Sequence, residues 1–214
     1  MIKIALLGAE STGKTQLATA ITATLRSQGH SVSPVSETLR QWCDQAGRTP
    51  RADEQQAIAQ AHTERIAQAP DATYLLADTT ALMTAVYSDV LFGDHSLYAA
   101  ALEQQRHFDL TLVMGLDLPW AADPQRDGPH SRAPVDAALR AALACANLPY
   151  QVVYGKDSAR TRNALHAIEK VASHAYGISA GGRFSSKNAA WTWNCEKCSD
   201  PECEHRLFTA LLHH

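Results

Sequence analysis

The octapeptide at residues 8–15 is the feature that most constrains the fold of this chain. It reads GAESTGKT and fits the G-x-x-x-x-G-K-[ST] pattern of a phosphate-binding loop. An apolar run at residues 2–7 comes directly before it, and a helix-compatible segment at residues 16–28 follows. This order of strand, loop and helix lets backbone N–H groups curl around a phosphate. The sequence therefore predicts a strand–loop–helix unit that binds a nucleoside triphosphate.

The side chains of this loop have separate predicted tasks. Lys14 is expected to reach the β and γ oxygens of the nucleotide, and the hydroxyl of Thr15 to bind Mg²⁺. A guanine-specific protein would carry an Asn-Lys-x-Asp run after a late strand. Residues 155–157 match that run poorly, which favours ATP as the nucleotide. The other loop residues predicted to bind it are Gly8, Glu10, Ser11, Thr12 and Gly13.

Chain length and net charge indicate what kind of molecule this protein binds. A chain of 214 residues is long enough for one α/β domain and a small appendage. Its net charge is −3 with both signs interspersed, which favours a small-molecule partner over nucleic acid. The N-terminus lacks a basic region before a long apolar stretch, and no run of about 18 apolar residues occurs. We therefore expect a cytoplasmic protein without a membrane or nucleic-acid partner.

Short apolar runs alternate with longer helix-compatible segments, which is typical of βα units around a parallel sheet. Strands are expected at residues 2–7, 31–36, 73–77, 110–114 and 150–154. Helices are expected at residues 14–28, 38–46, 53–68, 80–88, 97–106, 134–146 and 158–176. The stretch at residues 52–69 is rich in Ala and Gln, so it is a good helix former but a poor core element. We expect it to lie over the sheet edge.

Two segments interrupt this alternation. Residues 117–134 hold four prolines and a glycine together with Arg126 and Arg132, and they are expected to form a loop that carries cations. Residues 177–190 contain a Gly/Ser-rich run typical of a linker. The predicted organisation is a nucleotide-binding domain at residues 1–176, this linker, and a tail at residues 191–214.

Two carboxylates follow predicted strands directly, at the sheet edge where ligands of doubly wound folds bind. Asp78 is placed like the second-strand carboxylate that holds Mg²⁺ in phosphate-loop enzymes, and capping of the next helix is its alternative role. Glu37 is a candidate base for an acceptor hydroxyl, with Arg40 on the same acceptor side. The alternative is a surface ion pair between Glu37 and Arg40. The sequence leaves open which carboxylate is the base.

The proline-rich loop offers further candidates. Arg126 and Arg132 are expected to stabilise charge on the transferred phosphoryl group, or else to be ordinary surface arginines. Trp120 is expected either to stack on a flat heteroaromatic substrate or to pack in the core. Asp123 is a candidate acceptor for a ribose hydroxyl.

Several of these segments together resemble a known family. GAESTGKT, SETLR, ADTT and FDLTLVMGLDLPWAADPQRDG are similar to the ribosylnicotinamide kinase domain of bifunctional NAD-biosynthesis regulators, within the wider AAA-type phosphate-loop family. The resemblance covers residues 1–175, and its most specific part is residues 118–123 followed by Arg126. The family's glycine after Asp123 is Pro124 here, which fixes φ and removes a backbone donor.

The resemblance implies a five-stranded parallel sheet with helices on both faces. It also implies transfer of the ATP γ-phosphate to the 5′-hydroxyl of nicotinamide riboside or a related nucleoside. By the same resemblance, residues 13–15 bind phosphate, Glu37 and Asp78 act on substrate or metal, Trp120 and Asp123 contact the nucleoside, and Arg126 belongs to the lid.

The tail carries a separate set of metal-ligating residues, which are Cys195, Cys198, Cys203 and His205. Three thiolates and an imidazole within a short span suit a tetrahedral structural Zn²⁺. An iron–sulfur or redox role and unligated cysteines are the alternatives. Apolar residues around this set offer a face for packing on the body or on another subunit, so a homo-oligomer through the tail is conceivable.

Two other functions compete with a small-molecule kinase. One is a regulatory phosphate-loop ATPase or nucleotide switch whose zinc-stabilised tail binds a partner. The other is a zinc-dependent nucleic-acid handler, against which the acidic balance weighs.

Overall fold

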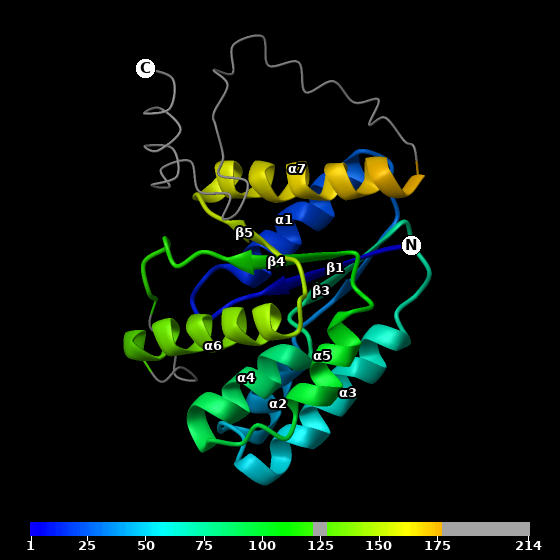
Figure 1. Ribbon diagram of the computed structural model, residues 1–214. Helices are drawn as coiled ribbons and strands as arrows, with labels where there is room; N and C mark the ends of the chain where they lie inside the picture. Colours follow the sequence, from blue (N-terminus) through cyan, green and yellow to red (C-terminus); the bar gives the residue numbers. More distant parts are fainter. Residues whose placement is uncertain (122–127, 177–214) are drawn as a thin grey trace.

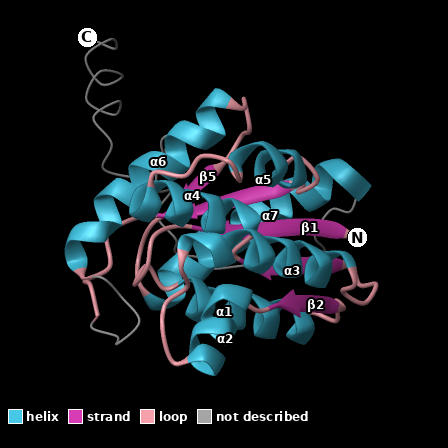
Figure 2. Cartoon of the chain, turned by 90° about the horizontal axis from the view of Figure 1, so that it is seen from below, coloured by secondary structure: helices cyan, strands magenta, loops and turns pink. Residues whose placement is uncertain are grey.

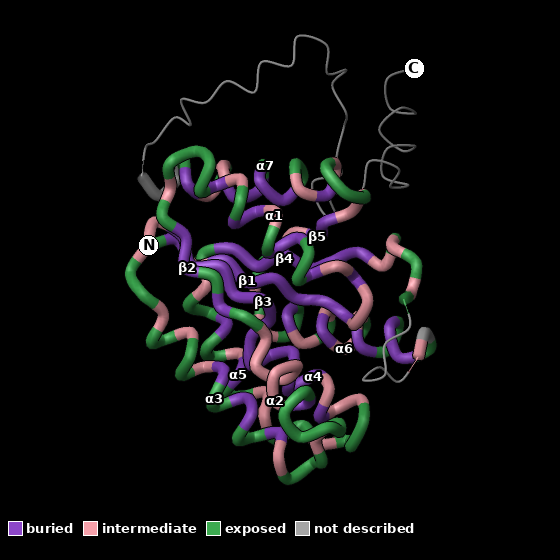
Figure 3. Tube along the Cα trace, turned by 180° about the vertical axis from the view of Figure 1, so that it is seen from behind, coloured by how far each residue is buried: buried purple, intermediate pink, exposed green. Residues whose placement is uncertain are grey.

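The structure is a computed structural model that describes residues 1–121 and 128–176. Its centre is a five-stranded, all-parallel sheet with the strand order β2-β3-β1-β4-β5 (Figure 1). The strands are β1 (Ile2–Leu7), β2 (Val32–Val35), β3 (Tyr74–Asp78), β4 (Leu110–Met114) and β5 (Gln151–Val153). Each lies within one residue of its predicted bounds, because these runs are short, apolar and buried (Figure 3).

Helices cover both faces of this sheet, so the predicted α/β fold is confirmed (Figures 1 and 2). One face packs against α1 (Lys14–Ser27) and α7 (Asp157–Tyr176) through Ile4, Leu6 and Leu112. The other face presents Ala5, Leu7 and Val113 to the remaining helices. The remaining helices are α2 (Thr38–Ala46), α3 (Gln55–Ala67), α4 (Ala81–Phe92), α5 (Tyr98–Gln105) and α6 (Arg132–Cys145), with the 3₁₀ turns η1 (Ala52–Glu54) and η2 (Pro129–Ser131).

The segment expected over the sheet edge does lie there. Ile66 of α3 packs against Val35 of the edge strand β2 and Ala77 of its neighbour β3. Outermost strand β2 also contains Pro34, which is exposed. The predicted helix from residue 53 begins instead as η1, because the side chain of Glu54 caps the backbone N–H of Arg51.

The predicted extent of the proline-rich loop is wrong at its C-terminal end. It was expected to run to residue 134, whereas α6 already begins at Arg132. Pro134 falls in the first turn of this helix, where backbone N–H groups have no intrahelical acceptor, so the proline is tolerated. The predicted linker and the Cys-rich tail lie outside the described residues.

Candidate active site

The phosphate loop joins β1 to α1, and two glycines shape its backbone. Gly8 has a φ of 147°, and a Cβ atom there would lie 2.9 Å from the Cβ of Met114. Gly13 is the N-cap of α1 with a φ of 78°. Both positions therefore need glycine, the first for a close approach to β4 and the second for a left-handed conformation.

Side chains of the phosphate loop donate hydrogen bonds to the backbone of the same loop. Lys14 is 9% exposed, and its ammonium donates hydrogen bonds of 2.9 Å to the carbonyls of Gly8 and Ala9. The hydroxyl of Thr12 donates a bond of 2.7 Å to the carbonyl of Ala9. The cation is thus fixed at the centre of a ring of backbone groups, where it can meet phosphate oxygens.

Thr15 and Asp78, the two predicted magnesium ligands, are in contact. The Thr15 hydroxyl donates a hydrogen bond of 2.6 Å to Oδ2 of Asp78. Asp78 is 4% exposed, and its Oδ1 has no hydrogen-bond partner among the described residues. A buried carboxylate oxygen without a partner, beside a hydroxyl oxygen, suits a hard cation such as Mg²⁺. The alternative role of Asp78 as a helix cap is wrong, because Thr80 caps α4 through a 3.3 Å bond from Leu82 N–H.

The turn after Asp78 has an unusual backbone that one histidine supports. Thr79 has a φ of 72°, which is strained for a β-branched residue. His62 of α3 is 2% exposed and lies with Nε2 3.0 Å from the Thr79 carbonyl and Nδ1 2.7 Å from the hydroxyl of Thr38. Burial lowers the pKa of His62, so the ring is neutral, donating from Nε2 and accepting at Nδ1.

His62 therefore joins the two predicted carboxylate sites. Thr38 directly follows Glu37, and Thr79 directly follows Asp78. The sequence analysis did not find this residue, because a single histidine in an Ala- and Gln-rich helix carries no local signal of such a bridge.

Glu37 and Arg40 stand at the start of α2 and form an ion pair. Arg40 Nε lies 3.8 Å from Glu37 Oε2, and their side chains are 42% and 17% exposed. Glu37 occupies the N-cap position but makes no capping hydrogen bond with its side chain. The predicted pair is present, and both residues also line the pocket described next.

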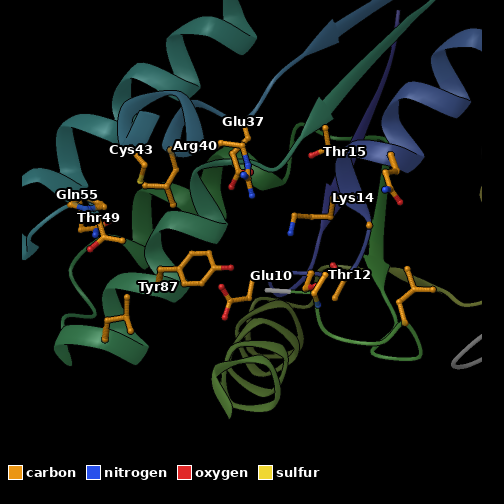
Figure 4. Close-up of a pocket in the computed structure, with 18 of the residues that line it drawn as sticks. Glu10, Thr12, Lys14, Thr15, Glu37, Arg40, Cys43, Thr49, Gln55 and Tyr87 are labelled. Carbon is orange, nitrogen blue, oxygen red and sulfur yellow. The ribbon is translucent and has the colours of Figure 1, made fainter. Parts of the chain in front are cut away.

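One pocket of about 980 Å³ connects the phosphate loop to α2, η1 and the end of α4 (Figure 4). Its phosphate end holds Lys14 and Thr15, and its far end holds Thr49 and Gln55, with Glu37 between them. The apolar residues that line it include Leu39, Cys43, Tyr87, Leu91, Phe92, Leu118 and Pro119. Leu91 and Phe92 are 46% and 42% exposed, which is unusual for large apolar side chains in this molecule.

Glu10 and Ser11 connect the phosphate loop to the segments after β4. Ser131 of η2 donates a hydrogen bond from its hydroxyl to the Glu10 carboxylate. The backbone N–H of Ala121 donates a bond of 2.7 Å to the Ser11 hydroxyl. Glu10 and Ser11 also line the pocket, in keeping with their predicted position beside the nucleotide.

Arg132 and Trp120 do not line this pocket. The guanidinium of Arg132 is buried and donates hydrogen bonds to the carbonyls of Leu118, at 2.9 Å, and Leu116, at 3.5 Å, so it braces the segment after β4. Trp120 is half-buried, and its indole N–H has no partner among the described residues. Their nucleotide and substrate roles stay predictions.

The other predicted ligands are not described by the structure. Asp123 and Arg126 lie outside the described residues, as do Cys195, Cys198, Cys203 and His205. Within residues 1–121 and 128–176, no group of three His, Cys, Asp or Glu side chains is arranged to hold a metal ion. The zinc site stays a prediction.

A further ion pair joins Asp117, in the segment after β4, to Arg160 in the first turn of α7. The buried Arg160 guanidinium lies 3.1 Å from Asp117 Oδ1, and Asp117 Oδ2 accepts a 2.7 Å bond from the N–H of Gly155. Burial lowers the pKa of Arg160, and the neighbouring Asp117 carboxylate opposes this shift. Sequence reasoning missed this pair. The same rule that selected Asp78, a carboxylate just after a buried strand, would have flagged Asp117.

The family described as an AAA domain matches residues 3–162. The chain belongs to this family. No curated protein sequence matches it. Within the part of the chain that is described, no helix is both long and apolar enough to cross a membrane.

Solved structures share the fold. A crystal structure of NadR protein in complex with NR has a TM-score of 0.67 at 17% identity, over 79% of this chain and 50% of that chain. A crystal structure of NadR protein in complex with NAD and AMP-PNP has a TM-score of 0.63 at 17% identity, over 79% of this chain and 49% of that chain. A structure of deoxyadenosine kinase from M. mycoides has a TM-score of 0.55 at 14% identity, over 79% of this chain and 100% of that chain.

At these identities the likeness shows the fold alone. The chain spans about half the length of the NadR chains. The resemblance drawn from the sequence motifs is thus confirmed in the wider AAA-type family and in the phosphate-loop fold, which these solved structures share.

Proposed function

We propose that this chain is an ATP- and Mg²⁺-dependent kinase that phosphorylates the 5′-hydroxyl of a nucleoside, with nicotinamide riboside as the first candidate. One observation carries the proposal. A single pocket runs from Lys14 and Thr15 past Glu37 to Gln55, so it has a phosphate end, a carboxylate and room for a second molecule beyond them. The NadR structures, which hold NR in one case and NAD with AMP-PNP in another, support the choice of acceptor.

The chain's own residues supply most of the chemistry. Phosphoryl transfer depends mainly on positioning and on neutralising charge. Lys14 would bind β and γ oxygens, while Thr15 and Asp78 would hold Mg²⁺, which when bound neutralises charge on the phosphates. Glu37 stands farther along the pocket and would accept the proton of the acceptor hydroxyl. We therefore assign the base to Glu37 and metal binding to Asp78.

The test is a screen of ribosides with ATP and Mg²⁺ that measures ADP release against a control without acceptor. Mass spectrometry would identify the phosphorylated product. We expect ADP release that depends on the acceptor and a matching gain of one phosphate on it. ADP release that is equal with and without every acceptor would overturn the proposal and favour the nucleotide switch instead.

A further inference from the structure

Gln55 carries a polar group that nothing described in the protein satisfies. It is the first residue of α3, it is 2% exposed, and it lines the pocket. Its side-chain oxygen is buried without a hydrogen-bond partner among the described residues. A buried amide oxygen without a partner costs free energy, and a ligand that donates a hydrogen bond to it would remove that cost. The orphan atom thus points to a polar group on the molecule that fills the pocket.

Gln55 lies at the end of the pocket opposite the phosphate loop. Figure 4 shows Gln55 beside Thr49 at one end, Lys14 and Thr15 at the other, and Glu37 and Arg40 between them. An acceptor whose hydroxyl meets Glu37 therefore extends its other end toward Gln55. That other end is the base of a nucleoside.

The walls around Gln55 favour a flat and largely apolar ring. Cys43 is 5% exposed, and burial raises the pKa of its thiol, so this wall is uncharged. Tyr87, Leu91 and Phe92 of α4 add apolar surface to the same pocket. Apolar surface of this kind leaves the orientation of a bound ring to the polar groups of the same pocket, of which Gln55 is one.

Hydrogen bonds to the Glu54 carboxylate hold the turn before Gln55 in one conformation. Glu54 accepts bonds of 2.8 and 2.6 Å from the Arg48 guanidinium and a bond of 2.8 Å from the backbone N–H of Arg51. The Arg48 guanidinium and the Arg51 N–H lower the pKa of Glu54 to about 2, so the carboxylate stays charged at every physiological pH. The backbone that carries Gln55 is therefore held in place before a ligand arrives, which favours selective binding.

We propose that Gln55 determines acceptor specificity by pairing with a carboxamide, or with the amino-bearing edge of a base, on the acceptor nucleoside. This inference rests on the proposed kinase function. An amide has an acceptor oxygen beside an N–H₂ donor, so a second amide can pair with both of its ends. A carboxylate has only acceptors and leaves the Gln55 oxygen unpaired whichever way the amide is turned.

The neighbouring arginines do not reverse this preference. The Arg40 guanidinium lies 3.8 Å from the carboxylate of Glu37. Arg51 pairs with Asp53 at 3.7 Å and Glu54 at 3.3 Å, and its side chain is 69% exposed, where water and salt screen its charge. The site therefore selects nicotinamide riboside over nicotinate riboside, which differs by carrying a carboxylate in place of the carboxamide.

The experiment compares kcat/KM for these two ribosides in the wild type, Gln55→Leu and Gln55→Met. The matched control is Gln56→Leu, because Gln56 is the exposed neighbour in the same helix. We expect the wild type and the control to prefer the amide by about 100-fold. Both Gln55 variants should lose about 10- to 100-fold for the amide and much less for the acid, with the KM for ATP unchanged.

The possible failures are distinguishable. Two outcomes would overturn the specificity role and leave the kinase function intact. One is an amide-to-acid ratio of kcat/KM that is the same in the Gln55 variants as in the wild type, and the other is a wild type that prefers the acid. A wild type that phosphorylates neither riboside, nor any nucleoside of the wider screen, would overturn the proposed function, and this inference with it. Two variants of different shape and a thermal melt of each separate a lost contact from a lost fold.

Discussion

The two ends of the pocket are built in different ways. Within the phosphate loop, polar side chains bond to the backbone of the same short segment, as in the bonds from Lys14 and Thr12 to the loop's own carbonyls. At the acceptor end, Gln55 comes from α3, Cys43 from α2 and Phe92 from α4, and the Gln55 oxygen is unpaired within the described chain. The phosphate end is a property of local sequence, whereas the acceptor end is a property of tertiary packing.

The largest expected effect of a substitution is at the phosphate end. Lys14→Ala should reduce kcat/KM by about 10³-fold or more, because Lys14 is the one cation within residues 8–15 and is expected to bind the β and γ oxygens. The fold should persist, and Lys170→Ala, an exposed change of the same kind on α7, is the control. Steady-state kinetics with a melting curve would check this. Near-normal turnover in a folded Lys14→Ala protein would refute the role of the loop.

Glu37→Gln tests the residue between the two ends. We expect kcat to fall by about 10²-fold while ATP affinity stays within about threefold, since a general base contributes mainly to the chemical step. ATP affinity is measured by calorimetry and kcat by coupled ADP release. Glu64→Gln, on the exposed side of α3, is the control. A variant that lost ATP binding in proportion to kcat would instead place Glu37 on the nucleotide.

Phe92→Ala tests the apolar wall of the acceptor end. Loss of this ring should raise the KM for the acceptor by about 10-fold, which corresponds to one partly buried aromatic contact. The KM for ATP should not change, because Phe92 belongs to α4 and not to the phosphate loop. Equal rises in both KM values would mean that the two ends of the pocket are not independent sites.

The smallest expected effect concerns His62, which bridges Thr38, next to Glu37, and Thr79, next to Asp78. Its folded pKa is lowered below 6.5, so the unfolded state binds the proton more readily. Above pH 6.5, the neutral His62 makes its full contribution to the free energy of unfolding. As the pH falls from 6.5 toward the folded pKa, this contribution decreases by at most about 1.4 kcal/mol per pH unit.

The comparison uses His62→Gln, which keeps an N–H donor for the Thr79 carbonyl and cannot titrate. Urea unfolding at pH 7 and pH 5 should show a larger loss of unfolding free energy in the wild type than in the variant. The same loss in both proteins would mean that other groups cause the acid sensitivity.

The sequence predicted the features that depend on local patterns. The strands match within one residue, since period and apolarity determine them, and α2 matches at both ends. The start of α3 was missed because a long side chain, Glu54, sets it by capping. Thr15 and Asp78 were each predicted to bind Mg²⁺. They meet because β1, which leads into the phosphate loop, pairs in parallel with β3, which ends at Asp78.

Gln55 and His62 were beyond the reach of a sequence argument. Their roles arise from contacts with residues far along the chain, such as the 3.0 Å approach of His62 to Thr79. Nothing in a helix-forming stretch of Ala and Gln distinguishes an amide that faces solvent from one that faces a pocket. Burial alone makes that distinction, and it is a property of the folded chain.

Pro34 in the edge strand β2 has a consequence for how molecules meet in concentrated solution. An edge strand normally offers a row of free N–H and C=O groups on which another chain can add a strand. The proline breaks that row of donors near its middle, and the strand is only four residues long. Addition of a strand from a second copy along β2 is therefore disfavoured, which lowers the tendency of the protein to associate edge to edge.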